Sequence, residues 1–415
     1  MRQIRKPAAI AVAGAFALLA AAMQPAFAQS ETDKLRAELE QLKVELRELR
    51  AAMNRQQKDS ATKQEVQAVQ AEVRETRSRT DDSGMLGRNT VAHLAGYGDV
   101  GYASVKDGAR GFNAATFNPI FHFQYKDALF FETELETKVQ ADGTTDVGLE
   151  YANLNYFLND NVTLFAGKFL SPLGYFRQNL HPSWINKFAS APTGFGHEGA
   201  APTSDVGAGA RGGFYLGAMK ANYALYVGNG PRLELNGAGD EIEAIEAEGS
   251  TSNPGNKSFV GGRFGLHPLP NLQLGVSAGS SKVAVEAPAG IEPTRSYRVE
   301  GADFAFQQKG FDLRGEYVRQ RVGDHASSVA PEGGAWSAHY LQAAYRFAGT
   351  GWEPVVRWGK FRSPHSDQRQ RQTAFGVNYW ISANAVVKLG VENNRGLAGT
   401  ATDRDRTLIQ FAYGF

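Results

Sequence analysis

The sequence contains no cysteine, which excludes disulfide bonds and metal sites built from thiolates. Beyond residue 28, no stretch approaches the ~18 consecutive apolar residues that a membrane-spanning helix needs. Charge of one sign is not in excess either, with 44 basic and 43 acidic residues, so composition gives no support for a nucleic-acid partner. If the chain crosses a membrane, it must do so as a closed β-barrel, because only helices and closed barrels satisfy all backbone polar groups in lipid.

Recognisable catalytic motifs are also missing. The sequence has no G-x-S-x-G or H-E-x-x-H, and its eight histidines are scattered. G-x-G-x-x-G occurs at 96–101, 194–199 and 207–212, but none of these follows a predicted strand and opens a helix, as a dinucleotide site requires. We therefore expect no enzymatic activity, no cofactor and no bound metal. The alternative is an enzyme whose site is assembled from separate strands.

Residues 1–28 have the layout of a secretory signal peptide. Arg2, Arg5 and Lys6 precede an apolar run over 8–22, and Ala26-Phe27-Ala28 ends in small residues. The apolar run is too short for a transmembrane helix, although an N-terminal anchor is the alternative. We expect the protein to be exported.

Residues 29–83 are predicted to form an α-helical coiled coil followed by a linker. Apolar residues recur at alternating steps of three and four, which is a heptad seam flanked by charge. The seam consists of Leu35, Leu39, Leu42, Leu46, Leu49 and Met53, and resumes at Val66, Val69, Val73 and Thr76. At 1.5 Å per residue the helix would extend roughly 70 Å. A solitary solvated helix is the alternative, but it would leave the leucine seam exposed.

From about residue 92 the period of apolar residues changes to two. Over 129–140, one parity places Leu129, Phe131, Thr133, Leu135, Thr137 and Val139 on one face, and the other places Phe130, Glu132, Glu134, Glu136, Lys138 and Gln140 opposite. One face suits lipid and the other suits water, which is the pattern of a transmembrane β-strand.

Sixteen such segments can be counted. They lie at about 92–105, 114–125, 128–140, 144–157, 161–169, 206–217, 219–229, 258–267, 271–284, 295–307, 310–322, 335–347, 352–362, 369–381, 384–395 and 404–415. Short and long connections alternate, as in bacterial outer-membrane barrels. Residues 84–415 are therefore predicted to be an all-β, sixteen-stranded antiparallel transmembrane barrel, with both ends on the short-turn side and the coiled coil in the periplasm. The parity of 144–157 breaks, which predicts a bulge there.

The chain ends in an alternating strand with a terminal aromatic residue, Phe415. With the signal peptide and the period of two, this ending resembles outer-membrane porins over residues 92–415. Gly167-Lys168-Phe169-Leu170-Ser171-Pro172-Leu173-Gly174 and Arg211-Gly212-Gly213-Phe214 most resemble the phosphate-selective porin O and P family, at the entry to and exit from its long third external loop. The resemblance implies a homotrimer in the outer membrane, among its lipids and lipopolysaccharide. It also implies an anion path lined by lysine and arginine, and recognition of Phe415 by the barrel-assembly machinery.

Strand parity also predicts which charged side chains line the pore. Acidic residues concentrate on one wall and basic residues on another, which would set a field across the lumen; alternatively, they pair locally and only stabilise the wall. The predicted lining comprises Glu132, Glu134, Glu136, Lys138, Lys220, Arg314, Glu316, Arg346, Arg357 and Lys388.

The connection 170–205 is predicted to fold into the barrel as the pore constriction. Loops of this length are uncommon unless functional or disordered, and its aromatic content calls for burial. Its candidate constriction residues are Arg177, His181, Trp184, Lys187, His197, Glu198 and Asp205. The alternative places the loop over the external rim. Because the loop carries as many acidic as basic residues, the sequence does not single out phosphate.

The expected function is passive diffusion of small hydrophilic solutes or ions through an outer-membrane porin. The alternative is a structural tether, in which the coiled coil links a non-conducting barrel to the cell wall or to a periplasmic partner.

Replacing Leu42 and Leu46 by Asp should weaken oligomers, because unpaired charge at a and d positions is costly to bury. The oligomeric state can be measured by light scattering, with conductance per barrel recorded in parallel. Loss of conductance from intact oligomers would instead indicate a coiled coil that plugs the pore.

Overall fold

The structure is a computed structural model that describes residues 89–197 and 199–415. The predicted signal peptide (1–28), the predicted coiled coil (29–83) and Glu198 lie outside the described residues. Within the described part of the chain, no helix has the length and hydropathy needed to cross a membrane.

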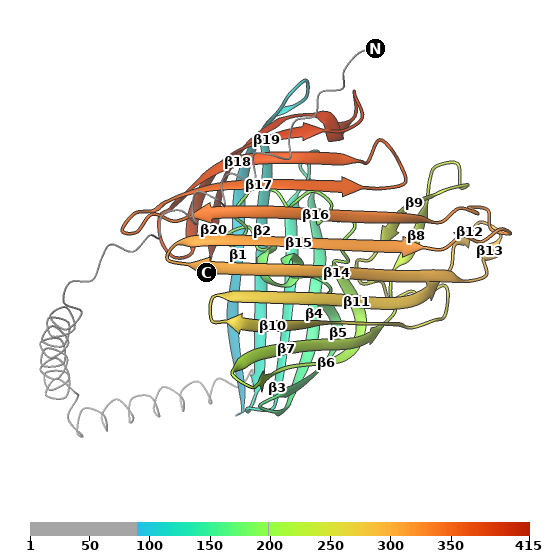
Figure 1. Ribbon diagram of the computed structural model, residues 1–415, viewed down its shortest axis with the longest axis horizontal. Helices are drawn as coiled ribbons and strands as arrows, with labels where there is room; N and C mark the ends of the chain where they lie inside the picture. Colours follow the sequence, from blue (N-terminus) through green and yellow to red (C-terminus); the bar gives the residue numbers. More distant parts are fainter. Residues whose placement is uncertain (1–88, 198) are drawn as a thin grey trace, which may run out of the picture. The chain divides into compact units, whose positions relative to one another are not determined.

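Sixteen antiparallel strands form a closed barrel in the described residues (Figure 1). Each strand pairs with its neighbour along the chain, apart from short hairpins in two connections, and β20 pairs with β1 to close the ring. The barrel strands are β1 (Thr90–Val105), β2 (Arg110–Tyr125), β3 (Leu129–Val139), β4 (Thr145–Asn159), β5 (Val162–Leu170), β6 (Ser204–Leu216), β7 (Met219–Gly228), β10 (Phe259–Leu269), β11 (Leu272–Val283), β14 (Arg295–Gln308), β15 (Phe311–Val322), β16 (Gly334–Tyr345), β17 (Trp352–Arg362), β18 (Gln370–Trp380), β19 (Ala385–Arg395) and β20 (Arg406–Gly414).

The predicted barrel and its strand order are confirmed. Most strand ends agree with the sequence within two residues, and the largest difference is at β2, which begins at Arg110 rather than at 114. The turn before β2 is tight, with the Val105 amide bonded to the Ala109 carbonyl at 3.0 Å, so pairing with β1 continues further than the apolar pattern indicated.

Alternate residues point outward along each strand. The outward residues include many exposed apolar side chains, such as Leu225, Val276 and Phe375. The inward residues are mostly polar, charged or packed against the segment that enters the barrel. Leu135 occupies an outward position, as the parity of 129–140 predicts, and so do Leu225, Leu313, Tyr345 and Val387 on their strands.

The predicted bulge lies in β4. Glu134 pairs with Tyr151 and Leu135 pairs with Leu149, so Glu150 is an extra residue on β4. Both Glu150 and Tyr151 are buried on the inner side, whereas Leu149 and Leu154 are exposed on the outer side. The bulge therefore adds one carboxylate to the interior.

The short turns gather at one end of the barrel and the long connections at the other. At the short-turn end, Leu216 pairs with Met219 across Gly217-Ala218, and Gly217 has a φ of 62°, which glycine adopts without strain. Asn89 lies at this end too, since its carbonyl accepts from the Lys126 amide at 2.9 Å. The carboxyl end of β20 also reaches this edge.

The long connections contain smaller elements. A hairpin of β8 (Arg232–Leu235) and β9 (Ile242–Glu246) lies between β7 and β10, and β12 (Glu286–Ala287) pairs with β13 (Gly290–Ile291) between β11 and β14. The 3-10 helix η1 (Ala401–Asp403) precedes β20, and α4 (Phe176–Leu180) lies between β5 and β6.

An arginine at an outward position should destabilise the barrel in lipid. Leu225→Arg should lower the free energy of unfolding by about 2–4 kcal/mol, because folding then places a charged side chain in the hydrocarbon core of the membrane. Inward Glu136→Arg serves as the control and should cost much less. Urea unfolding in phospholipid vesicles measures both, and equal effects would contradict the face assignment.

Candidate functional site

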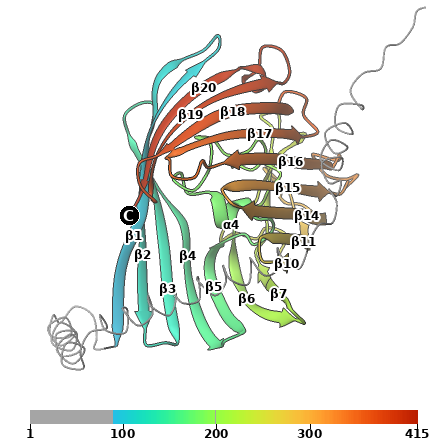
Figure 2. The same cartoon turned by 60° about the vertical axis from the view of Figure 1, so that its left-hand side comes forward.

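The segment 170–205 lies inside the barrel, as its hydrogen bonds to inward side chains of many strands show. It begins at the end of β5, forms α4 within the ring of strands, and returns to the wall at β6 (Figure 2). Of the two alternatives left open by the sequence, the structure has the one inside the barrel.

Acidic side chains of the wall bind the first part of this segment. Buried Glu316 accepts hydrogen bonds from the amides of Tyr175 and Phe176, at 3.0 and 2.9 Å. Gly174, at a φ of 102°, allows this approach, because a Cβ there would lie 2.0 Å from a Glu316 carboxylate oxygen. The loop therefore docks at a position that accepts only glycine without rearrangement.

Basic side chains of the wall bind the second part. The buried Lys388 ammonium donates to the carbonyls of Ser183 and Phe188. The Arg357 guanidinium donates to the Ser190 carbonyl at 2.9 Å and to the Ala191 carbonyl at 3.3 Å. Irregular backbone inside a barrel needs such partners, because buried backbone polar groups are costly when unsatisfied.

Apolar packing fills one side of the lumen. Leu173, Phe176 and Phe195 of the loop pack in one buried cluster with inward residues of β11 and β14–β17. Those wall residues are Val283, Val299, Val318, Val322, Trp336, Tyr340 and Phe361. The open space is therefore displaced toward the opposite wall.

Two cavities remain between the loop and the strands of that wall. One, of about 630 Å³, faces the short-turn end, and the other, of about 300 Å³, faces the long-loop end. Their linings have only Glu134 of β3 and His181 of the loop in common. The two residues thus mark the level at which the cavities meet, which we call the neck.

Three groups define the geometry of the neck. The Tyr97 hydroxyl donates to Glu134 Oε1 at 2.8 Å, and His181 Nε2 lies 3.7 Å from Glu134 Oε2. His181 Nδ1 lies 2.6 Å from the Arg177 carbonyl, which orients the ring. The wall and the loop thus meet through polar side chains, a carboxylate and an imidazole.

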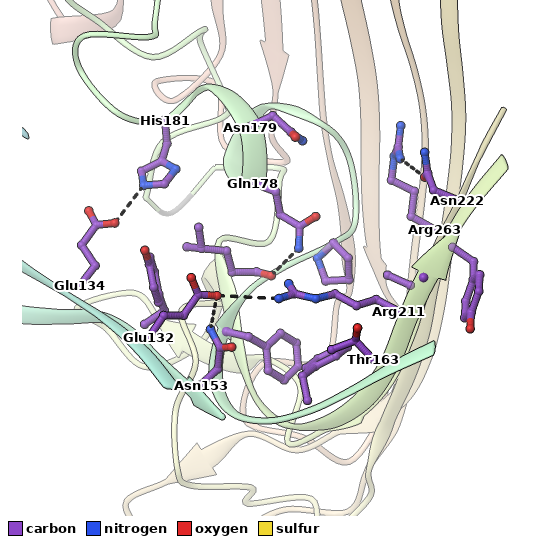
Figure 3. A pocket seen from close by; sticks show the side chains of 18 of the residues that line it. Glu132, Glu134, Asn153, Thr163, Gln178, Asn179, His181, Arg211, Asn222 and Arg263 are labelled. Carbon is purple, nitrogen blue, oxygen red and sulfur yellow. Dashed lines mark hydrogen bonds and ion pairs between the residues drawn. The ribbon is translucent and has the colours of Figure 1, made fainter. Parts of the chain in front are cut away.

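The larger cavity is lined by both acidic and basic side chains (Figure 3). Glu132 lies 3.8 Å from Arg211 and accepts from the Asn153 amide at 3.3 Å. Arg263 also lines the cavity and is paired with Asp303 at 2.6 Å. Both arginines are therefore compensated by carboxylates.

The smaller cavity is lined by Asp99, Glu136, Lys138 and the ion pair of Arg177 with Glu150. His197 lines its outer side and binds Glu248 at 2.8 Å. The hydrogen bond to Glu248 raises the pKa of His197. Carboxylates outnumber cations along this part of the lining.

The predicted pore-lining residues fall into three groups. Glu132, Glu134, Glu136 and Lys138 line the cavities. Arg314, Glu316, Arg357 and Lys388 point inward but are buried beneath the loop and line neither cavity, which differs from the expectation. The reason is that the loop covers these side chains and hydrogen-bonds to Glu316, Arg357 and Lys388. Lys220 and Arg346 lie at the short-turn end, where Arg346 stacks on Trp380 at 5.0 Å.

The predicted loop residues also divide. Arg177, His181 and His197 line the cavities. Lys187 is instead an anchor, paired with Glu353 at 2.7 Å, and Trp184 lies against Gly414. Asp205 is buried in β6 and accepts from the Gly230 amide at 3.1 Å, and it lines neither cavity. Glu198 lies outside the described residues.

Sequence analysis did not identify Tyr97, Asp99, Glu150, Arg211 or Arg263 as cavity residues. Asp99 and Tyr97 could have been found, since they share a parity in the first strand. Glu150 was hidden by the bulge, and the glycine-rich strand around Arg211 has only a weak apolar stripe. Arg263 could have been found, since Val260, Phe264 and Leu266 share the opposite parity on its strand.

A metal or cofactor is not suggested by the side chains. His93 and His122 stack in the lumen near the short-turn end, with their Nδ1 atoms 3.2 Å apart. Among residues 89–197 and 199–415, however, no cluster of three or more His, Asp or Glu side chains is arranged to hold a metal ion.

Comparison with known proteins identifies similar folds. The chain resembles an anion-selective porin from Comamonas acidovorans at 13% identity and a TM-score of 0.54, over 79% of this chain and 100% of that one. It also resembles a loop L8 deletion mutant of OmpT, an outer membrane protein of Vibrio cholerae, at 10% identity and a TM-score of 0.53. This match covers 79% of this chain and 100% of the OmpT mutant. The trimer form of in-vitro folded OmpT from the same organism matches at 10% identity and a TM-score of 0.51, over 79% of this chain and 99% of that one. No protein-family model and no curated protein matches the sequence.

At these identities the likeness concerns the fold. The barrel of this chain has the architecture of outer-membrane porins, with a long segment after the fifth strand. The finer resemblance to the O and P family is not tested by these structures.

Removing an anchor of the loop should loosen it. Arg357→Met removes the hydrogen-bond donor of the Ser190 and Ala191 carbonyls, and should weaken docking of the loop on the wall by about 1–3 kcal/mol. We expect faster proteolytic cleavage within 170–205 of the folded protein in neutral detergent. Arg362→Met, on the same strand but facing outward, is the control and should leave cleavage unchanged; cleavage of both variants at the wild-type rate would contradict the anchoring role.

Proposed function

We propose that the protein is an outer-membrane porin through which small hydrophilic solutes and ions diffuse passively. The observation that carries the proposal is the pair of polar cavities that meet at Glu134 and His181 inside a closed barrel. They would be the two halves of one water-filled path. Diffusion along it requires no reacting group, so we propose no enzymatic activity.

The segment 170–205 would set the width of this path. It occupies the side of the lumen next to β14–β17 through apolar packing, and its His181 forms one side of the neck. The remaining route runs along β1–β7 and β10, whose inward side chains line the two cavities. Pore size then depends on how firmly the loop is held against the opposite wall.

The charges along the path favour small cations weakly. Arg177, Arg211 and Arg263 each have a carboxylate within ion-pair distance. In contrast, Asp99, Glu134 and Glu136 line the path with no ion pair to a lysine or arginine among the described residues, and Lys138 is the remaining cation. Free cations are the groups that a phosphate path would use, so this lining does not favour phosphate.

We further propose that the barrel resides in the outer membrane as a homotrimer. The anion-selective porin and the trimer form of OmpT among the structural matches support this proposal. Export through the signal peptide, insertion through Phe415 and a periplasmic coiled coil would fit the same topology.

Single-channel recording in planar bilayers tests the proposed function. Purified protein should give stepwise currents that scale with salt concentration, and proteoliposomes should swell in solutions of small sugars. An intact barrel that conducts nothing would reject the porin and favour the tether.

Deleting 178–200 should raise conductance and admit larger solutes, because it removes the second half of α4 and His181, the loop side of the neck. Conductance and the exclusion size for sugars measure the change, with heat-modifiable migration on gels as the check that the barrel has folded. Unchanged conductance and exclusion size would place the constriction elsewhere.

Glu134→Gln with Glu136→Gln should lower the preference for cations, because two uncompensated carboxylates leave the path. We expect the permeability ratio of K⁺ to Cl⁻ to fall roughly twofold or more. Glu332→Gln, an exposed change in the connection between β15 and β16, is the control. A ratio unaffected by the double variant would exclude these side chains from the path.

A further inference from the structure

The outer face of β14–β19 carries a band of basic side chains near the long-loop end. We define the cationic rim as Arg298, Arg319, Lys360, Arg362, Arg371 and Arg395. All occupy outward positions within a few residues of a long connection. We propose that the cationic rim binds the phosphate groups of anionic lipids in the outer-facing leaflet. The proposal rests on the membrane orientation given above, but not on conduction.

Three members of the rim form a direct row across neighbouring strands, and Ser337 of β16 lies between Arg319 and Arg362. Lys360 of β17 lies directly opposite Arg371 of β18, which lies directly opposite Arg395 of β19. Directly opposite side chains are about 4.5–5.5 Å apart at Cβ, and like charges there repel. Three cations in one row therefore destabilise the long-loop ends of these strands unless an anion lies between them.

The protein supplies little of that negative charge. Arg395 lies 3.8 Å from Asp405 but its side chain is 72% exposed. Glu300, the other nearby outward carboxylate, lies directly opposite Arg319 and pairs with Arg321 at 3.3 Å, so it is shared between two arginines. Within the described residues, Arg298, Arg319, Lys360, Arg362 and Arg371 have no carboxylate within 4.0 Å. The guanidinium groups among them are free to bind phosphate oxygens in a bidentate manner.

Apolar side chains lie immediately below the rim on the same strands. Going toward the short-turn end, the outward residues are Tyr317, Leu341, Trp358, Phe375 and Val391, all of them substantially exposed. Trp358 packs beside His339 at a ring distance of 5.0 Å, at the boundary between the two zones. Trp and Tyr favour the membrane–water interface, so this boundary matches the depth of lipid head groups.

The combination identifies the occupant as an amphiphile. A soluble anion would satisfy the cations but leave the apolar surface below them uncovered. A phosphorylated lipid satisfies both, with its acyl chains along Trp358 and Phe375 and its phosphates between Lys360, Arg371 and Arg395. Basic residues near a membrane surface strengthen the binding of anionic lipid.

The experiment uses the full-length protein in a neutral detergent, titrated with lipid A, a diphosphorylated lipid, and followed by native mass spectrometry. The variant Lys360→Gln/Arg362→Gln/Arg371→Gln removes three charges from the rim. The matched control Lys106→Gln/Arg110→Gln/Lys257→Gln removes three exposed charges at the same end of the barrel but outside the rim. Heat-modifiable migration checks that each barrel is folded.

We expect the rim variant to bind lipid A at least tenfold more weakly, and the control variant to bind as the wild type does. Inorganic phosphate at equal concentration should not displace the lipid, whereas high salt should weaken binding. Equal losses in both triple variants, or no loss in either, would overturn the proposal. Displacement by inorganic phosphate would do the same, because the site would then hold a free anion. Conductance of the rim variant should stay at the wild-type value, so the porin proposal and the lipid proposal fail separately.

Discussion

A long irregular backbone inside a barrel must find hydrogen-bond partners where water is largely excluded, and this requirement organises the interior. The wall meets it with charged side chains: Glu316 accepts from two amides of the loop, and Lys388 and Arg357 donate to four carbonyls. Burial of these charges would be costly alone, but each is bound to several loop atoms. The charges that looked like pore lining are therefore the supports of the loop.

This docking makes the lumen asymmetric. Because the charged anchors and many of the apolar ones lie on β14–β19, the loop covers that half of the wall, and the open route remains along β1–β7 and β10. Glu134, on the uncovered half, then faces His181 across the neck. The outer surface is asymmetric in the same sense, since the rim of basic residues also belongs to β14–β19.

The fold was predictable from sequence to a large extent, because each transmembrane strand must alternate in lipid, and sixteen alternating segments close in only a few ways. The bulge at Glu150 was visible as a break in parity. The interior was less accessible. Parity assigned Arg357 and Lys388 correctly to the inner face, but it does not reveal which part of the inner face a loop will cover. The position of the loop depends on close contacts such as that of Gly174 with Glu316, and these residues are far apart in the chain. Arg211 was missed because its strand, β6, is rich in glycine and alanine and few large apolar residues mark its outward face.

The contact of Trp184 with Gly414 ties the middle of the chain to its last strand. Lys388 and Gly414 belong to β19 and β20, the two strands made last, so the loop has no complete docking surface until these strands are in place. Contacts of such sequence separation form slowly, because loop closure must precede them. Biogenesis therefore has an inherent order: the ring is sealed first and the interior is filled afterwards, so a partly built barrel is transiently wider than the finished one.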